Sequence, residues 1–226
     1  ALNDLSMRIR ARTTVGIVGP TGSGKTTVVD MILGLLDPQA GILTVDNCVV
    51  DNSNRMQWQK LVGYVPQQIY LSDDTIAANI AFGLGHDSVD ENAVKQAAIV
   101  ANLHDFISKE LPYGYQTIVG ERGVRLSGGQ RQRIGIARAL YHRPKILIMD
   151  EATSALDNIT EQAVMDAVNN LGHQITIIII AHRLTTVRGC DKIFLLNQGK
   201  VEATGDYEEL IATSNQFRTM TSSNQV

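Results

Sequence analysis

One glycine-rich segment limits the possible folds of this chain more than any other feature. It reads Gly19-Pro20-Thr21-Gly22-Ser23-Gly24-Lys25-Thr26, directly after the β-branched run at residues 15–18 and before a helical pattern. Glycines at this spacing let backbone N–H groups turn toward one centre, and a helix start adds partial positive charge. Lys25 supplies a mobile cation, and Thr26 supplies a hydroxyl suited to Mg²⁺. A turn that merely precedes a helix is the alternative, but the strand and helix flanks favour a phosphate-binding loop.

Short apolar runs recur along the chain, and most are continuous rather than alternating, which is typical of strands covered on both faces. We expect strands at residues 15–18, 61–65, 146–149, 175–180 and 192–196. Helical patterns at residues 26–35, 130–141 and 160–170 lie between several of them. This alternation predicts an α/β fold with a mostly parallel sheet.

Residues 69–124 follow a different pattern. They contain three helical segments, at residues 75–82, 91–102 and 104–110. There is no clear strand among these segments. We therefore expect a helical subdomain inserted into a core formed by residues 1–68 and 125–226. Near the end, residues 196–200 predict a turn between two strands, and the acidic residues 206–209 predict a helix start.

Composition excludes several classes of protein. The chain has 226 residues, 44% of them hydrophobic, which suits one sizeable domain or two small ones. Its longest apolar stretches fall far short of the roughly 20 residues that span a bilayer. The net charge is −3 and the sequence has no runs of Lys or Arg, so it does not predict a basic surface that would bind nucleic acid. Cys48 and Cys190 suggest neither a disulfide framework nor a zinc site, and the first residues predict no secretory signal, so we expect exposure to the cytosol.

A second glycine-containing segment, Leu126-Ser127-Gly128-Gly129-Gln130, precedes a predicted helix. Ser127 and Gln130 have the spacing of a capping box, which satisfies the first N–H groups of a helix. Capping does not account for the two glycines, because they lower helix propensity in the first turn. Their presence predicts that something approaches this backbone closely, and a phosphate is one candidate.

Two acidic residues, Asp150 and Glu151, follow the apolar run at residues 146–149. A carboxylate at the end of a buried strand is costly unless it meets a cation or several donors, and Mg²⁺ bound to ATP would serve. Glu151 projects differently and could instead be a solvated loop carboxylate. His182 directly follows the apolar run at residues 175–181. A lone histidine at the end of a strand usually has its hydrogen bonds satisfied at the edge of the sheet and has no further role.

The order of these motifs resembles the ABC ATPase family. Residues 126–130, about a hundred residues after the phosphate loop and shortly before residues 146–151, are similar to its signature sequence, and the resemblance extends from Leu2 to about Met220. It implies a P-loop NTPase (RecA-like) core. It also implies a head-to-tail dimer, in which the signature loop of each copy closes over the ATP held by the other.

The resemblance implies a role for each motif residue. Glu151 would orient and polarise the attacking water, His182 would contact the γ-phosphate, and Lys25 would complete the catalytic set. The implied ATP-binding residues are Gly19, Pro20, Thr21, Gly22, Ser23, Gly24, Lys25, Thr26, Thr27 and Gln67. The second copy would add Ser127, Gly128, Gly129, Gln130 and Asp157. The implied Mg²⁺ ligands are Thr26, Gln67 and Asp150.

Two of these assignments keep alternatives. Gln67 resembles the glutamine that joins the core to the helical insertion, but the neighbouring Gln68 leaves the assignment open by one position. Residues 154–157 resemble the loop that reaches across the dimer; the alternative is a helix-capping turn before Thr160.

Residues 117–123 resemble the exporter-specific loop that touches the intracellular helices of transmembrane domains. Residues 70–76 and 79–83 also resemble exporters, and faintly those that move lipids or lipid-linked sugars. The resemblance therefore implies the ATP-hydrolysing domain of an exporter, on the cytoplasmic side of a membrane, using ATP and Mg²⁺. Its partners would be a second ABC ATPase domain and transmembrane domains, reached through the helical subdomain and residues 117–123, and not nucleic acid. The alternatives are a soluble mechanochemical ATPase acting on nucleic acid or ribosomes, and a non-hydrolysing regulatory domain.

The family normally has an aromatic residue upstream of the phosphate loop that stacks on adenine. Here 18 residues precede Gly19 and none is Phe, Tyr or Trp. We therefore expect that the chain lacks the N-terminal part of the domain and that base stacking is weak.

Overall fold

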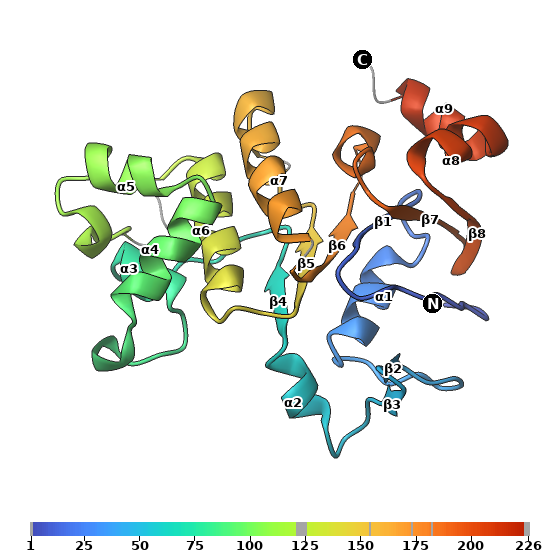
Figure 1. Ribbon diagram of the computed structural model, residues 1–226, viewed down its shortest axis with the longest axis horizontal. Helices are drawn as coiled ribbons and strands as arrows, with labels where there is room; N and C mark the ends of the chain where they lie inside the picture. Colours follow the sequence, from blue (N-terminus) through green and yellow to red (C-terminus); the bar gives the residue numbers. More distant parts are fainter. Residues whose placement is uncertain (1, 121–125, 154, 173, 182, 224–226) are drawn as a thin grey trace. The chain divides into compact units, whose positions relative to one another are not determined.

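The computed structural model describes residues 2–120, 126–153, 155–172, 174–181 and 183–223. The chain divides into two compact units. The first unit contains Ala1–Val62 and Gln174–Val226, and the second contains Gly63–His173. Each unit is built from both strands and helices (Figure 1). The predicted boundaries of a helical subdomain at residues 69–124 stay a prediction.

Neighbouring strands form the centre of the first unit, in the order β6 (Thr176–Ile180), β1 (Thr14–Val18), β7 (Lys192–Asn197) and β8 (Lys200–Gly205). β1 pairs in parallel with both β6 and β7, whereas β7 and β8 are antiparallel. Every residue of β1 and β6 is buried, which explains why these runs are continuously apolar. The predicted α/β fold with a mostly parallel sheet is confirmed.

Helix α1 (Lys25–Ile32) follows β1 through the phosphate loop and ends earlier than predicted. Gly34 has a left-handed φ of 67°, its N–H donates to the Met31 carbonyl, and the N–H of Leu35 donates to the Asp30 carbonyl. These bonds form a Schellman motif, which satisfies the last carbonyls of a helix. The apolar residues Leu33 and Leu35 extend the helical pattern in the sequence, so the pattern alone does not reveal the stop.

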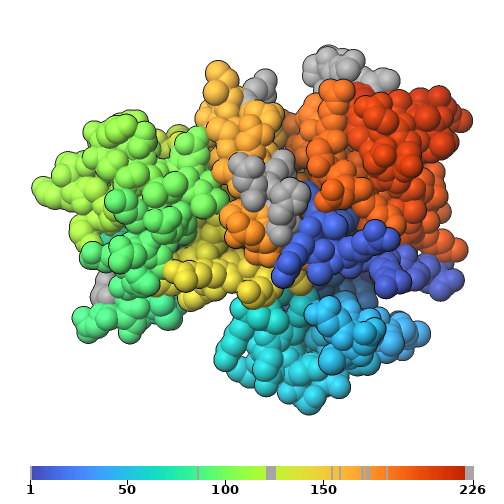
Figure 2. Space-filling view, viewed as in Figure 1, coloured from blue at the N-terminus to red at the C-terminus, as the bar shows by residue number. Residues whose placement is uncertain are grey.

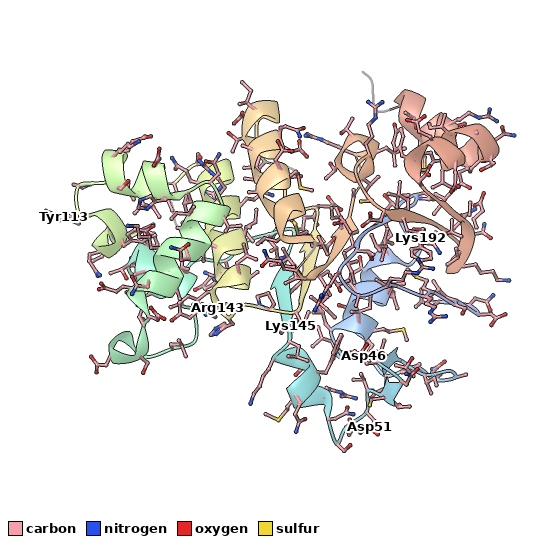
Figure 3. All side chains as sticks on the ribbon, viewed as in Figure 1. Asp46, Asp51, Tyr113, Arg143, Lys145 and Lys192 are labelled. Atoms are coloured by element: carbon pink, nitrogen blue, oxygen red, sulfur yellow. The ribbon has the colours of Figure 1, made fainter. Side chains whose placement is uncertain are left out.

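The structure contains a small hairpin that the apolar pattern did not predict, formed by β2 (Thr44–Val45) and β3 (Cys48–Val49). Asp46 and Asn47 both have positive φ, as a two-residue turn of type I′ requires. Helix α2 (Arg55–Gln59) follows after Asp51, whose carboxylate accepts hydrogen bonds from the backbone and hydroxyl of Ser53. Figure 3 labels Asp46 and Asp51. Strands of two residues are too short to show a period.

The predicted turn and helix near the C-terminus are confirmed. Gln198 and Gly199, both with positive φ, connect β7 to β8. The Asp206 side chain forms a capping box with Glu209 at the start of α8 (Tyr207–Thr213). α9 (Asn215–Ser223) packs on α8 through an edge-to-face contact between Phe217 and Tyr207, and α8 lies beside β8 (Figure 1). A 3-10 turn, Leu184–Val187, lies between β6 and β7.

The second unit combines two neighbouring strands, β4 (Val62–Val65) and β5 (Ile146–Asp150), with a group of helices. The helices are α3 (Ile76–Ile80), α4 (Glu91–Val100), α5 (His104–Glu110), α6 (Gly128–Tyr141) and α7 (Asn158–Gly172). Short 3-10 turns occur at His86–Ser88 and Gly114–Gln116. The first three helices confirm the helical segments expected from the sequence. In the space-filling view they form the green surface (Figure 2).

Helix α6 organises the packing of the second unit, because both α3 and α4 pack against it. Its apolar face contains Ile134 and Ile136, both fully buried. Gly135 lies between them, and a Cβ there would come within 2.3 Å of Ile69 Cδ1. A larger residue at position 135 would therefore force the Ile69 side chain to move. Within the described ranges, no helix is both long and apolar enough to cross a bilayer.

Arg138, near the end of α6, ties this helix to α3. Its guanidinium donates to the Asn79 carbonyl (2.8 Å), to the Tyr70 carbonyl (2.9 Å) and to Asn79 Oδ1 (3.3 Å). It also lies 4.6 Å from the centre of the Phe82 ring. Burial lowers the pKa of Arg138 below its ordinary value. The guanidinium therefore donates its hydrogen bonds to oxygen atoms of the protein in place of water.

We expect Arg138→Met to lower the free energy of unfolding by about 2 to 4 kcal/mol, because it removes hydrogen bonds to the buried Asn79 and to the Tyr70 carbonyl. Urea unfolding followed by circular dichroism measures this change. Arg143→Met, at an exposed arginine after the same helix (Figure 3), is the matched control and should unfold like the wild type. Equal unfolding midpoints for the two variants would contradict the role given to Arg138.

Candidate nucleotide and magnesium site

The phosphate loop connects β1 to α1 in the first unit, as predicted. Gly19, Gly22 and Gly24 have φ values of 153°, 79° and 107°, which disfavour residues with a Cβ. A Cβ on Gly19 would also lie 2.2 Å from the Leu196 carbonyl oxygen. Gly24 occupies the N-cap position of α1 and makes no side-chain cap. No capping side chain therefore competes with a phosphate for the first N–H groups of this helix.

Lys25 lies at the start of α1 and is 6% exposed. Its ammonium donates to the carbonyl oxygens of Gly19 (2.7 Å) and Pro20 (3.0 Å), within its own loop. Thr26 is exposed and Thr27 is half-buried. The buried Ser23 hydroxyl has no hydrogen-bond partner among the described residues. A buried cation and an unsatisfied hydroxyl in a glycine-lined loop suit phosphate oxygens.

The acidic pair lies at the end of β5 in the second unit: Asp150 is the last residue of the strand, and Glu151 follows it. Tyr64 Oη lies 3.4 Å from Asp150 Oδ2. Glu151 has a left-handed φ of 50°, unusual for a residue with a side chain, and its Oε2 accepts a hydrogen bond of 2.9 Å from Gln67 Nε2. The structure thus brings together Gln67 and Glu151, which are 84 positions apart in the sequence. It also places Gln67, rather than Gln68, in contact with the acidic pair.

The second glycine segment forms the first turn of α6. Ser127 and Gln130 make a reciprocal capping box, which confirms the capping interpretation. A Cβ on Gly128 would lie 3.2 Å from Ala155 Cβ, and a Cβ on Gly129 would lie 3.2 Å from Leu156 Cδ2. The close approach predicted from these glycines is therefore made by the protein's own chain.

Asp157 caps the next helix, α7, by accepting a hydrogen bond of 3.0 Å from the Thr160 N–H. This bond, together with one from the Thr160 side chain, lowers the pKa of Asp157. The capping turn considered from the sequence is thus present. His182, Ser154 and residues 121–125 lie outside the described residues, so the structure does not place the predicted histidine or the end of the predicted exporter loop.

Sequence reasoning missed two polar residues next to the acidic pair, Tyr64 and Gln132. Gln132 donates to the Glu151 carbonyl and accepts from the Ala155 N–H. A signal for it exists in the sequence, because it lies at helical spacing from the buried positions Ile136 and Ala139. A polar side chain on that apolar face must find buried partners.

A glycine-lined phosphate loop between a parallel strand and a helix, with an acidic pair after another strand, defines a P-loop nucleotide-binding protein. A family model described as "ABC transporter" matches residues 2–154. The chain belongs to the ABC transporter family. The predicted enzyme class, an ATPase of this family, agrees with this match.

Individual relatives carry exporter names. The chain is 46% identical, over 95% of its length, to the ATP-dependent lipid A-core flippase of Saccharophagus degradans, of which it covers 36%. It is 41% identical, over 93% of its length, to ABC transporter ATM1 of Toxoplasma gondii, of which it covers 18%. It also matches the structure of a bacterial Atm1-family ABC exporter with ATP bound, with a TM-score of 0.92 and 38% identity. That match covers all of this chain and 39% of the exporter chain, and it confirms the P-loop NTPase fold. The chain thus spans about a third or less of the curated relatives named here.

Proposed function

We propose that this chain is the ATP-hydrolysing domain of an ABC exporter, which uses hydrolysis of Mg-ATP to drive transport. The observation that carries the proposal is the phosphate loop, in which three glycines at positive φ surround a buried lysine. The flippase and Atm1 names of the relatives support the exporter assignment. The net charge of −3 does not favour the alternative, a motor acting on nucleic acid.

Hydrolysis requires one group that orients water and others that neutralise charge on the transferred phosphate. We assign the first role to Glu151, whose carboxylate is already held by Gln67. Lys25 stabilises the terminal phosphates, and His182 is proposed to contact the γ-phosphate. The backbone of residues 19–24, together with Thr26 and Thr27, binds the phosphate chain.

The residues proposed for Mg²⁺ suit its preference for oxygen ligands. Thr26 offers an exposed hydroxyl, and Asp150 offers a carboxylate at the end of β5. Gln67 donates to Glu151 through Nε2, so its amide oxygen Oε1 is the atom suited to the ion. When bound, Mg²⁺ neutralises phosphate charge. Gln67 could then contact both the ion and the residue that orients water.

The signature residues Ser127, Gly128, Gly129 and Gln130 are proposed to bind the ATP of a second copy, together with Asp157. The first N–H groups of a helix have no partner inside the helix; Ser127 caps the N–H of Gln130, and the N–H groups of Gly128 and Gly129, at the start of α6, are those proposed for the phosphate. Each copy would therefore provide one loop to its own nucleotide and another to that of its partner, which is a two-fold arrangement.

We expect Glu151→Gln to form a dimer when Mg-ATP is added, because the bound nucleotide persists and joins the two copies. Sedimentation velocity should show the monomer mass doubling with ATP and staying unchanged with ADP. A mass that stays monomeric at saturating ATP would contradict the proposal that ATP makes this chain dimerise. It would not bear on hydrolysis, which is tested separately.

The transmembrane partner is proposed to contact the second unit around α3. Several large apolar side chains there are exposed, namely Tyr70, Phe82, Leu84 and Ile118. Ile118 belongs to the loop at residues 117–123 and bridges to Thr75, at the start of α3. An exposed apolar group of this kind is typical of an interaction surface. This assignment places the chain on the cytoplasmic side of a membrane, and the flippase relative favours a lipid or lipid-linked cargo.

A further inference from the structure

Gln132 is a buried amide on helix α6, one turn beyond the signature glycines. Its side chain is 4% exposed, although glutamine is a residue that normally stays in contact with water. Burying an amide is unfavourable unless its donor and its acceptor both find partners. The hydrogen-bond partners of the Gln132 amide therefore show which part of the chain this side chain holds in place.

Both ends of the Gln132 amide contact the segment that follows β5. Its Oε1 accepts a hydrogen bond of 3.0 Å from the Ala155 N–H, and its Nε2 lies 3.4 Å from the Glu151 carbonyl oxygen. The amide therefore contacts both Glu151 and Ala155. Ala155 and Leu156 also lie beside Gly128 and Gly129, where added Cβ atoms would be 3.2 Å from them.

Glu151 needs such support because its backbone has a left-handed conformation, with φ of 50°. This conformation costs an ordinary residue about 1–2 kcal/mol, so surrounding contacts must maintain it. The direction of the Glu151 side chain depends on that backbone. Gln67 fixes the carboxylate through Oε2, and Gln132 contacts the carbonyl of the same residue.

We propose that Gln132 is a positioning residue for hydrolysis: it holds the backbone of Glu151 and of Ala155, and so aims the Glu151 carboxylate. The inference rests on the proposed role of Glu151 as the group that orients water. Gln132 itself touches neither nucleotide nor water in this role. It also joins the helix that begins with the signature glycines to the residue that acts on the chain's own ATP.

The first test is Gln132→Met, which keeps the length of the side chain but removes both hydrogen bonds. We expect kcat per nucleotide-binding molecule to fall ten- to a hundredfold, because small displacements of a catalytic group have effects of this size. The KM for ATP should stay within about twofold, because the phosphate loop is unchanged. Gln162→Met, at an exposed glutamine on α7, is the matched control and should keep the wild-type kcat.

The second test is Gln132→Glu, measured against pH. A protonated carboxyl can accept from the Ala155 N–H and donate to the Glu151 carbonyl, whereas a carboxylate cannot donate. The kcat of this variant, relative to wild type at the same pH, should therefore fall as pH rises through the pKa of the new carboxyl. The Met variant should stay low at every pH. Because kcat is expressed per nucleotide-binding molecule, this profile separates positioning from a loss of folded protein, and it remains measurable if Gln132→Met does not fold.

The third test combines Gln132→Met with Glu151→Gln. If Gln132 acts through Glu151, Gln132→Met adds no further loss of turnover to that of Glu151→Gln alone. A wild-type kcat in Gln132→Met, a flat relative pH profile in Gln132→Glu, or a full additional loss in the double variant would each overturn the inference. If Glu151→Gln alone leaves turnover unchanged, the proposed function of Glu151 fails instead, whatever Gln132 does.

Discussion

Glu151→Gln is expected to lower steady-state phosphate release at least about a hundredfold while ATP binding is retained. The amide keeps the shape of the carboxylate but carries no negative charge to polarise the attacking water. The phosphate loop lies in the other unit of the chain, at residues 19–26, and does not depend on this side chain. Phosphate release under saturating Mg-ATP and equilibrium binding of a fluorescent ATP analogue measure the two effects.

Glu208→Gln is the matched control, because Glu208 is an exposed carboxylate on α8. It should release phosphate at the wild-type rate. If Glu151→Gln also hydrolyses ATP at that rate, another group orients the water and the role given to Glu151 is wrong.

Lys25→Ala is expected to reduce both ATP affinity and turnover, with kcat/KM lower by about 10²–10³. Lys25 is buried among the carbonyl groups of its own loop, and no other basic residue occurs in residues 19–26. Its loss leaves the terminal phosphates without the one cation that this loop provides. Isothermal titration with ATP and steady-state phosphate release measure the two losses.

Lys192→Ala is the control for Lys25→Ala, because Lys192 is an exposed lysine at the beginning of β7, whereas the phosphate loop approaches Leu196 near its end (Figure 3). It should bind and hydrolyse ATP normally. Wild-type kcat/KM in the Lys25 variant would show that the ammonium does not contact the phosphates.

The strands and most helices were predictable because burial on both faces and helical spacing leave clear patterns. β1 and β6 are entirely buried and read as continuous apolar runs. The hairpin of β2 and β3 was not predictable from hydrophobicity, because strands of two residues show no period. The hairpin is defined instead by its turn, in which Asp46 and Asn47 have positive φ. Likewise, the end of α1 depends on the left-handed Gly34 rather than on hydrophobicity.

The site was predictable where one motif supplies its own context, as the phosphate loop does. Its glycines have the positive φ values that the spacing indicates. Contacts between distant positions were not predictable, and the pairing of Gln67 with Glu151 is one example. The glycines at 128 and 129 were ambiguous for a physical reason: a nearby phosphate and nearby side chains of the protein can both require glycine, and the structure shows the side chains of Ala155 and Leu156 beside them.

Phosphate release by the purified 226-residue chain, compared directly with Lys25→Ala, tests the central claim that this phosphate loop supports ATP hydrolysis. The account predicts that wild-type release saturates with ATP, stops when EDTA removes Mg²⁺, and exceeds that of Lys25→Ala at least about tenfold. Equal release by the two proteins would contradict it.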